Sequence, residues 1–178
     1  MIQGNLISLR ALEVEDLPKL KEWRNRKHVR RSTREYRLLN MIHQKEWFEF
    51  IHKNNPPREI MFGVLDKRKK LIGVTGLTYI DWKNRNSEIS IYLSFENWQK
   101  KKEAIEVLEL IMEYGFGEIN MNRLWVEIYG NMKENITLFK KMKFFEEGKL
   151  RQKIWRDKKW WDSFIYSKLA SEYHGTKN

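Results

Sequence analysis

The chain has 178 residues, 41% of them apolar, which suits one folded domain over residues 1–178 and argues against disorder. It contains no cysteine, which excludes disulfides, thiolate nucleophiles and thiolate metal sites. With 35 basic and 24 acidic residues its net charge is +11, which leaves polyanionic partners such as nucleic acids and phosphorylated cofactors open.

The N-terminal half alternates strand-like and helix-like segments. Val14, Leu17, Leu20 and Trp23 recur roughly one helical turn apart, which predicts a helix there. Three later runs resemble strands and are separated by charged or Asn-rich turns. In chain order the expected elements are a strand at 5–12, a helix at 13–25, an irregular basic segment at 24–40, a helix at 42–53, and strands at 59–68, 70–81 and 86–94.

The C-terminal half begins with a basic turn, Lys100–Lys102, and the longest expected helix. Ile105, Leu108, Ile111 and Met112 have helical spacing within that helix. The expected elements are a helix at 101–117, a strand at 122–129, a helix at 133–143, and two strands within 149–170 around a turn at 157–159. The order β-α-α-β-β-β-α-β-α-β-β predicts a single mixed α/β domain.

Four strings of this sequence are similar to those of one known family. They are LIGVTGLTYIDWKNRNSEISIYL (71–93), EVLELIMEYGFGEINMNRLWVEIY (106–129), LFKKMKFFEEGKLR (138–151) and DKKWWDSFIYSKL (157–169). Together they resemble the GNAT superfamily of acetyl-CoA-dependent N-acetyltransferases, in the branch of ribosomal-protein N-terminal, spermidine and amino-sugar acetyltransferases. The resemblance covers nearly the whole chain. It implies an α/β (mixed α+β) GNAT domain with a central mixed, mostly antiparallel twisted sheet flanked by helices.

The resemblance places the acetyl-CoA pyrophosphate at the loop Gln99-Lys100-Lys101-Lys102-Glu103-Ala104, where the family has Q/R-x-x-G-x-G/A. Positive charge and free N–H groups at a helix start suit a phosphate, and the alternative is a solvated helix start without a ligand. Lys102 stands at a glycine position, where it either offers its N–H with an ordinary φ or contacts phosphate through its ammonium. Lys143 and Lys158 also replace family glycines, at a cost of roughly 1 kcal/mol each where φ is positive.

Three more residues are expected at the cofactor by resemblance. Phe139 stands where relatives often keep a tyrosine that protonates the leaving CoA thiolate, and phenylalanine has no proton to donate. Either Asn131 or Asn135 fills the role of the family's asparagine after the fifth strand. A thiol is acidic enough to leave as thiolate, so the loss of the tyrosine is compatible with activity.

The alternating string NSEISIYL carries the candidate base, Glu88, on the face opposite to Ile89. Glu88 matches the glutamate of the family's R-x-A-E-I string, and a carboxylate can take a proton from an amine or hold its ammonium in place. The alternative is an exposed strand glutamate paired with a lysine. The catalytic oxyanion donor is expected among the backbone N–H groups of Leu93 and Ser94, after the β-bulge that usually splays this strand in the family.

The basic segment WRNRKHVRRSTREYR, Trp23–Arg37, lies where this branch forms its acceptor-binding wall. Seven of its fifteen residues are arginine or lysine. That charge suits an acidic acceptor, a sugar nucleotide or RNA and fits a polyamine poorly, and the alternative is a solvated loop. The expected substrate-binding residues are Trp23, Arg24, Glu35, Tyr36 and Tyr92.

These features predict an N-acetyltransferase that moves an acetyl group from acetyl-CoA to a primary amine, which is a protein N-terminus, an amino sugar or another small amine. The amine is expected to attack directly within a ternary complex, because no cysteine can carry the acetyl group. One alternative is a catalytically degenerate domain that binds a ligand, motivated by Lys102 and Phe139. Another is a basic nucleic-acid-binding protein, motivated by Trp155, Trp160 and Trp161 among lysines.

Other patterns bound the setting of the protein. The four histidines show no metal-ligand spacing, so no metal is expected. The first residues lack the apolar run of a signal peptide and no stretch resembles a membrane span, so we expect a cytoplasmic protein without membrane association. A monomer or homodimer is expected, and the positive charge leaves ribosomal or RNA association open.

Overall fold

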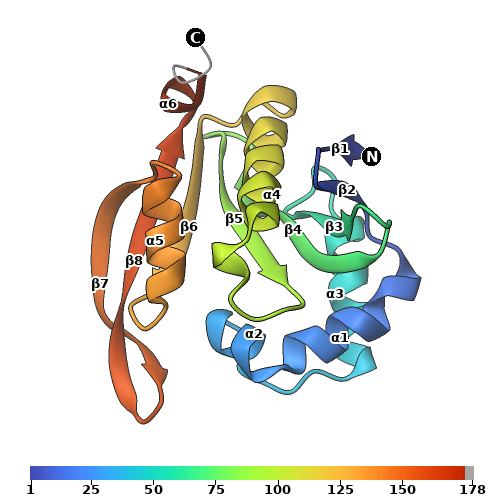
Figure 1. Cartoon of the computed structure of the whole chain (residues 1–178), viewed down its shortest axis with the longest axis horizontal. Coiled ribbons are helices and arrows are strands. Elements are labelled where there is room, and N and C mark those ends of the chain that lie inside the picture. Colours follow the sequence, from blue (N-terminus) through green and yellow to red (C-terminus); the bar gives the residue numbers. More distant parts are fainter. Residues whose placement is uncertain (175–178) are drawn as a thin grey trace.

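The computed structural model describes residues 1–174, so residues 175–178 of the predicted domain lie outside the described part. Within that part, eight strands form one sheet in the order β1-β2-β3-β4-β5-β6-β8-β7 (Figure 1). They are β1 (Ile2–Gln3), β2 (Ile7–Ala11), β3 (Ile60–Asp66), β4 (Leu71–Asp81), β5 (Asn86–Leu93), β6 (Arg123–Tyr129), β7 (Phe145–Arg156) and β8 (Lys159–Leu169). Neighbouring strands are antiparallel except β5 and β6, which are parallel, so the predicted mixed, mostly antiparallel sheet is confirmed.

The helices largely follow the predicted order. They are η1 (Val14–Asp16), α1 (Leu17–Asn25), α2 (Lys27–Ser32), α3 (Met41–Lys53), η2 (Trp98–Lys100), α4 (Lys102–Glu113), the π-helical turn η3 (Tyr114–Glu118), α5 (Lys133–Lys141) and α6 (Ala170–His174). The segment expected to be irregular contains α2, because Val29 is buried in the core and anchors that short helix. In the part of the chain that the structure describes, no helix has the length and apolar character needed to cross a membrane.

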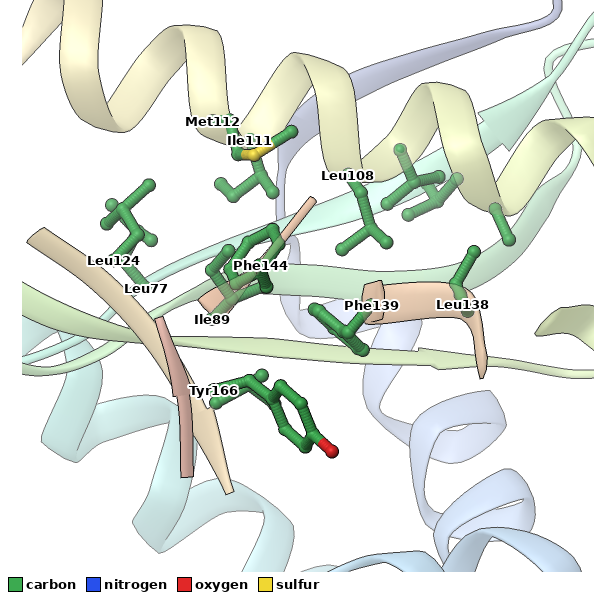
Figure 2. Close-up of a cluster of buried hydrophobic side chains, with 14 of the residues drawn as sticks. Leu77, Ile89, Leu108, Ile111, Met112, Leu124, Leu138, Phe139, Phe144 and Tyr166 are labelled. Carbon is green, nitrogen blue, oxygen red and sulfur yellow. The ribbon is translucent and has the colours of Figure 1, made fainter. Parts of the chain in front are cut away.

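Two hydrophobic clusters cover the two faces of the sheet. On one face Leu108 and Ile111 of α4 pack over Leu77 and Ile89 of the sheet (Figure 2). On the other face α1, α2 and α3 pack over a smaller cluster that includes Tyr92. The strand β5 therefore sends alternate residues to opposite faces, as predicted.

The three lysines at family glycine positions differ in backbone conformation. Lys143 and Lys158 have φ of 58° and 59°, so the condition for the strain cost, a positive φ, is met at both. Asp157 also has a positive φ of 54°, and the two residues Asp157 and Lys158 form the tight turn between β7 and β8. Lys102, by contrast, is the first residue of α4 and is not among the residues with positive φ.

Candidate active site

A cleft opens where β5 and β6 part. The two strands are paired only over residues 86–88 of β5 and 123–125 of β6. Beyond that point β5 stays paired with β4 as far as Leu93, while β6 stays paired with β8 as far as Tyr129. Each strand follows its other neighbour, and a cavity of about 310 Å³ lies between them.

The splay forms without the expected β-bulge in this stretch. The register of β5 against β4 is continuous from Glu88 to Leu93, and it shifts instead between Thr78 and Asp81. The physical reason is that β4 and β8 hold β5 and β6 along their lengths, so sheet twist separates the two strands and no extra residue is needed.

The N–H groups of β5 alternate between β4 and the cleft. Ser94 donates its N–H to the carbonyl oxygen of Ile72 at 2.8 Å. Because hydrogen-bonded positions alternate in an antiparallel pair, the N–H groups of Ile91 and Leu93 point away from β4, to the side on which β5 parts from β6. Of the two expected oxyanion donors, Leu93 therefore has its N–H available, whereas that of Ser94 is already used.

The loop expected to bind pyrophosphate forms the start of α4. Gln99 and Lys100 lie in η2, Lys101 is extended, and α4 begins at Lys102. The N–H groups of Lys100 and Lys101 are bonded to carbonyl oxygens of the preceding turn, at 3.1 and 2.9 Å. The N–H groups of 102–104 lie in the first turn of α4, where no intrahelical carbonyl can reach them. These groups and the lysine charges make this end of α4 suited to a phosphate.

A cavity of about 380 Å³ lies beside η2, just before this helix start, and meets the cleft. Ser32, Met132 and Asn135 line both. The side-chain oxygen of Asn135 accepts a hydrogen bond from Gln99 at 2.6 Å. The buried Oδ1 atom of Asn131 has no hydrogen-bond partner within residues 1–174. Of the two asparagines left open by the sequence, Asn131 is therefore the one whose oxygen is free for a ligand.

Arg34 holds two carboxylates of the cleft together. Its guanidinium donates to both oxygens of Glu88, each at 2.7 Å, and to Glu127 at 2.9 Å. Burial favours a higher pKa for Glu127, but hydrogen bonds from Ser163 and Arg34 outweigh it and keep that pKa below its ordinary value. Glu88 is only 5% exposed. It is thus the buried half of a bidentate ion pair whose arginine side chain is 44% exposed, rather than an open base or a surface glutamate paired with lysine.

The five expected substrate-binding residues divide between cleft, core and surface. Arg24, Glu35 and Tyr92 line the cleft, and the guanidinium of Arg24 lies 5.7 Å from the centre of the Tyr92 ring. A hydrogen bond from the guanidinium of Arg37 lowers the pKa of Glu35 to about 2. Trp23 instead lies in the core, because its spacing on α1 puts it on the buried face. Tyr36 is 72% exposed and is not part of the cleft lining.

Glu59 is a cleft residue that the sequence analysis missed. It precedes β3, is half-buried, and accepts a hydrogen bond from Nε1 of Trp47 at 3.3 Å. Burial raises its pKa above the ordinary glutamate value. It also borders an adjoining cavity of about 510 Å³. Nothing in the string PREIMF distinguishes this glutamate from one that faces solvent.

The charge of the cleft is opposite to that of the basic segment. Its lining contains four carboxylates and two guanidiniums, which belong to Glu35, Glu59, Glu88, Glu127, Arg24 and Arg34. The expectation that positive charge would repel a cationic acceptor does not hold for this lining.

Across the described residues, no group of three or more His, Cys, Asp and Glu side chains is placed to hold a metal ion.

Phe139 and the tryptophans of the C-terminal hairpin make packing contacts. Phe139 is 1% exposed and lies in the hydrophobic cluster with Phe144 (Figure 2), which it meets edge to face at 5.1 Å between ring centres. It also lines the cleft. The rings of Trp155 and Trp160 lie 5.2 Å apart across the hairpin. The ammonium of Lys159 lies 3.8 Å from the Trp161 ring centre. Trp155 and Trp160 nevertheless stay 51% and 56% exposed, so they contact each other across the hairpin without being buried.

Comparison with known proteins agrees with the resemblance. Residues 9–165 match the family model described as Acetyltransferase (GNAT) domain. The spermidine N(1)-acetyltransferase of Vibrio cholerae is 26% identical over 168 residues, which cover 94% of this chain and 95% of the relative. The uncharacterized N-acetyltransferase p20 of Bacillus licheniformis is 25% identical over 171 residues, which cover 95% of this chain and 96% of the relative.

Solved structures share the fold. The spermidine N-acetyltransferase from Vibrio cholerae in complex with CoA and spermine superposes with a TM-score of 0.85 at 24% identity, covering 96% of this chain and 99% of that one. A dodecameric structure of spermidine N-acetyltransferase from Vibrio cholerae gives a TM-score of 0.82 at 23% identity, covering 98% of this chain and 100% of that one. At 23–24% sequence identity, the structural similarity shows a shared fold.

Proposed function

Because the chain belongs to the GNAT acetyltransferase family and is an acetyl-CoA-dependent N-acetyltransferase, we propose that it acetylates a cationic primary amine in the cleft between β5 and β6. The observation that carries the proposal is that the cavity beside η2 meets a cleft whose carboxylates outnumber its guanidiniums. A carboxylate-rich cleft suits an ammonium group. Relatives named spermidine N(1)-acetyltransferases support a polyamine as the first acceptor to try, with amino sugars and protein N-termini as the other amines.

The residues beside α4 fit acetyl-CoA, which supplies an activated acetyl thioester. The N–H groups of Lys102–Ala104 would bind its pyrophosphate, with Lys100 and Lys101 adding positive charge. The buried, unpartnered Oδ1 of Asn131 would accept from an amide N–H of the cosubstrate.

Different residues near the point where β5 and β6 part would carry different steps of the acetyl transfer. The N–H of Leu93 is directed to the side on which β5 parts from β6 and would stabilise the oxyanion that develops on the acetyl carbonyl. The acceptor ammonium must lose a proton before its nitrogen can attack, and a carboxylate of the cleft is suited to take it. Glu88 can do so only after Arg34 leaves it, since Arg34 occupies both of its oxygens. A thiol with pKa near 8.5 leaves readily as thiolate, so Phe139 in place of an acid is tolerated.

The test begins with calorimetric titration of acetyl-CoA into the protein. A panel of spermidine, spermine, glucosamine and a peptide with a free N-terminus is then added, and released CoA is measured with a thiol-reactive chromophore. The absence of cysteine gives this assay no protein background. Transfer to at least one amine is expected. Binding without transfer to any amine would favour the degenerate domain, and steeply salt-dependent oligonucleotide binding without acetyl-CoA binding would favour the nucleic-acid alternative.

A further inference from the structure

A second cavity on the cofactor side, of about 380 Å³, lies between the start of α4 and α5. Lys100 of η2 and Ile105 in the first turn of α4 line one side of it, and Lys133, Thr137 and Lys141 of α5 line the other. The two helices contribute to the same hydrophobic cluster and so lie on the same face of the sheet (Figure 1). This space is the α4–α5 groove.

The α4–α5 groove continues the path that runs from the cleft through the cavity beside η2. That cavity shares Met132 and Asn135 with the cleft, and it shares Gln99 and Glu134 with the groove. Acetyl-CoA is an elongated molecule whose parts follow in the order thioester, pantetheine, pyrophosphate and 3′-phosphoadenosine. With its thioester where β5 and β6 part and its pyrophosphate at the first turn of α4, its nucleotide end would reach the groove, which borders that turn at Ile105.

The lining of the groove contains three lysines and one carboxylate, that of Glu134. Lys100, Lys133 and Lys141 take part in no ion pair among residues 1–174. Lys133, Thr137 and Lys141 follow one another at intervals of one helical turn, which puts them on one face of α5. A phosphomonoester carries nearly two negative charges at neutral pH, and lysine is a common phosphate ligand. These lysines are therefore available to such an anion.

Part of the groove wall is apolar. Leu138 is 4% exposed, Ile105 is half-buried, and both line the groove. A flat purine ring gains by covering such aliphatic side chains, because the contact removes apolar surface from water. The groove therefore offers cations for a phosphate and an apolar wall for a base.

We propose that the α4–α5 groove binds the 3′-phosphoadenosine end of acetyl-CoA and that Lys133 and Lys141 pair with its 3′-phosphate. The inference rests on the proposed function and deepens it, because it names residues that recognise the nucleotide end of the cosubstrate. The two lysines are two helical turns apart, about 12 Å along α5, so a phosphate beside Thr137 is within reach of both long side chains. The adenine ring lies against Ile105 and Leu138. The protein should therefore bind acetyl-CoA more tightly than the form without the 3′-phosphate.

The test measures, by calorimetry, the affinities for acetyl-CoA and for acetyl-3′-dephospho-CoA. The wild type should bind the dephospho form about tenfold more weakly, a gap that should narrow as salt is added. Lys133→Gln/Lys141→Gln should bind acetyl-CoA about tenfold more weakly than the wild type and the dephospho form almost as well, so its preference should disappear. Lys67→Gln/Lys70→Gln, at the turn between β3 and β4, removes the same charge elsewhere and is the control, which should keep the preference of the wild type.

The outcomes separate this inference from the proposed function. If the wild type binds both forms equally well, or if Lys133→Gln/Lys141→Gln weakens both equally, the groove does not recognise the 3′-phosphate, while the proposed function stands. A control variant that loses the preference as well would trace it to net charge and overturn the inference. If the wild type binds neither form, the proposed function fails. Adenosine 3′,5′-bisphosphate, titrated alone, then probes the groove, and equal affinities of the wild type and the Lys133→Gln/Lys141→Gln variant would overturn the inference as well.

Discussion

The cofactor cavity and the acceptor cleft share a boundary but are built from different parts of the chain. On the cofactor side the main chain supplies the expected contacts, through the first turn of α4 and the N–H of Leu93. In the cleft the side chains supply them, and ion pairs hold Glu35, Glu88 and Glu127. A site made of backbone tolerates an exchanged side chain such as Lys102. A site made of paired charges should fail when one partner is changed.

The largest effect is expected from Glu88→Gln, which keeps the shape of the side chain and removes its charge. Arg34 then loses its bidentate partner and the wall of the cleft loosens, so turnover of the fastest panel amine should fall by about 10²-fold. Calorimetric affinity for acetyl-CoA should hardly change. Unchanged turnover at neutral pH would show that the pair does not shape the acceptor site.

Arg34→Met decides what Glu88 does. If Glu88 fixes the wall together with Arg34, this variant should lose turnover as Glu88→Gln does, and the double variant should be little worse than either single one. If Glu88 is itself the base, freeing its carboxylate should preserve or raise the rate. Lys149→Met, which removes one partner of the exposed Lys149–Asp162 pair, is the matched control and should have no effect on turnover.

A smaller effect is expected on the cofactor side from Lys100→Glu/Lys101→Glu. Reversed charge beside the α4 start should weaken acetyl-CoA binding by roughly tenfold or more, because the pyrophosphate would then face negative charge. Lys67→Glu/Lys70→Glu, at the turn between β3 and β4, changes the net charge equally at another place. Calorimetry measures the affinity of both double variants for acetyl-CoA. Equal affinities would show that the loop at residues 99–104 does not bind the cosubstrate.

The three lysines at glycine positions give a stability test of about 1 kcal/mol. Lys143→Gly and Lys158→Gly should each raise the free energy of unfolding by roughly that amount, because φ is positive at both positions. Lys102→Gly should give no such gain, since Lys102 has helical φ and glycine is a poor helix former. Urea unfolding curves measure all three. A higher free energy of unfolding for Lys102→Gly would contradict the conclusion that the backbone at the start of α4 is unstrained.

The difference between contacts made by the main chain and contacts made by paired side chains also explains how much of the molecule the sequence could predict. Helix and strand order, the two faces of β5 and the place of the basic loop before α4 follow from local periodicity and short strings. The Arg34–Glu88 pair joins residues 54 positions apart, and one of them lies in a segment without periodicity. Glu127 could have been placed, because Trp125 is the register partner of Glu88 and alternation puts Glu127 on the same face. That step requires the parallel register, which local patterns do not contain.

The smallest effect is expected from Phe139→Tyr, at the boundary between the two regions. Phe139 lines the cleft yet is 1% exposed and packs edge to face against Phe144. A hydroxyl that reaches the cleft would give the departing thiolate a proton donor, so turnover should stay equal or rise a few-fold, since a thiol with pKa near 8.5 leaves readily unaided. Phe144→Tyr is the control, because that ring lies in the same cluster and is not part of the cleft lining. A Phe139→Tyr variant that binds acetyl-CoA, gains no rate and loses stability as the control does would place its hydroxyl in the core, where an unpaired polar group costs about 1–3 kcal/mol.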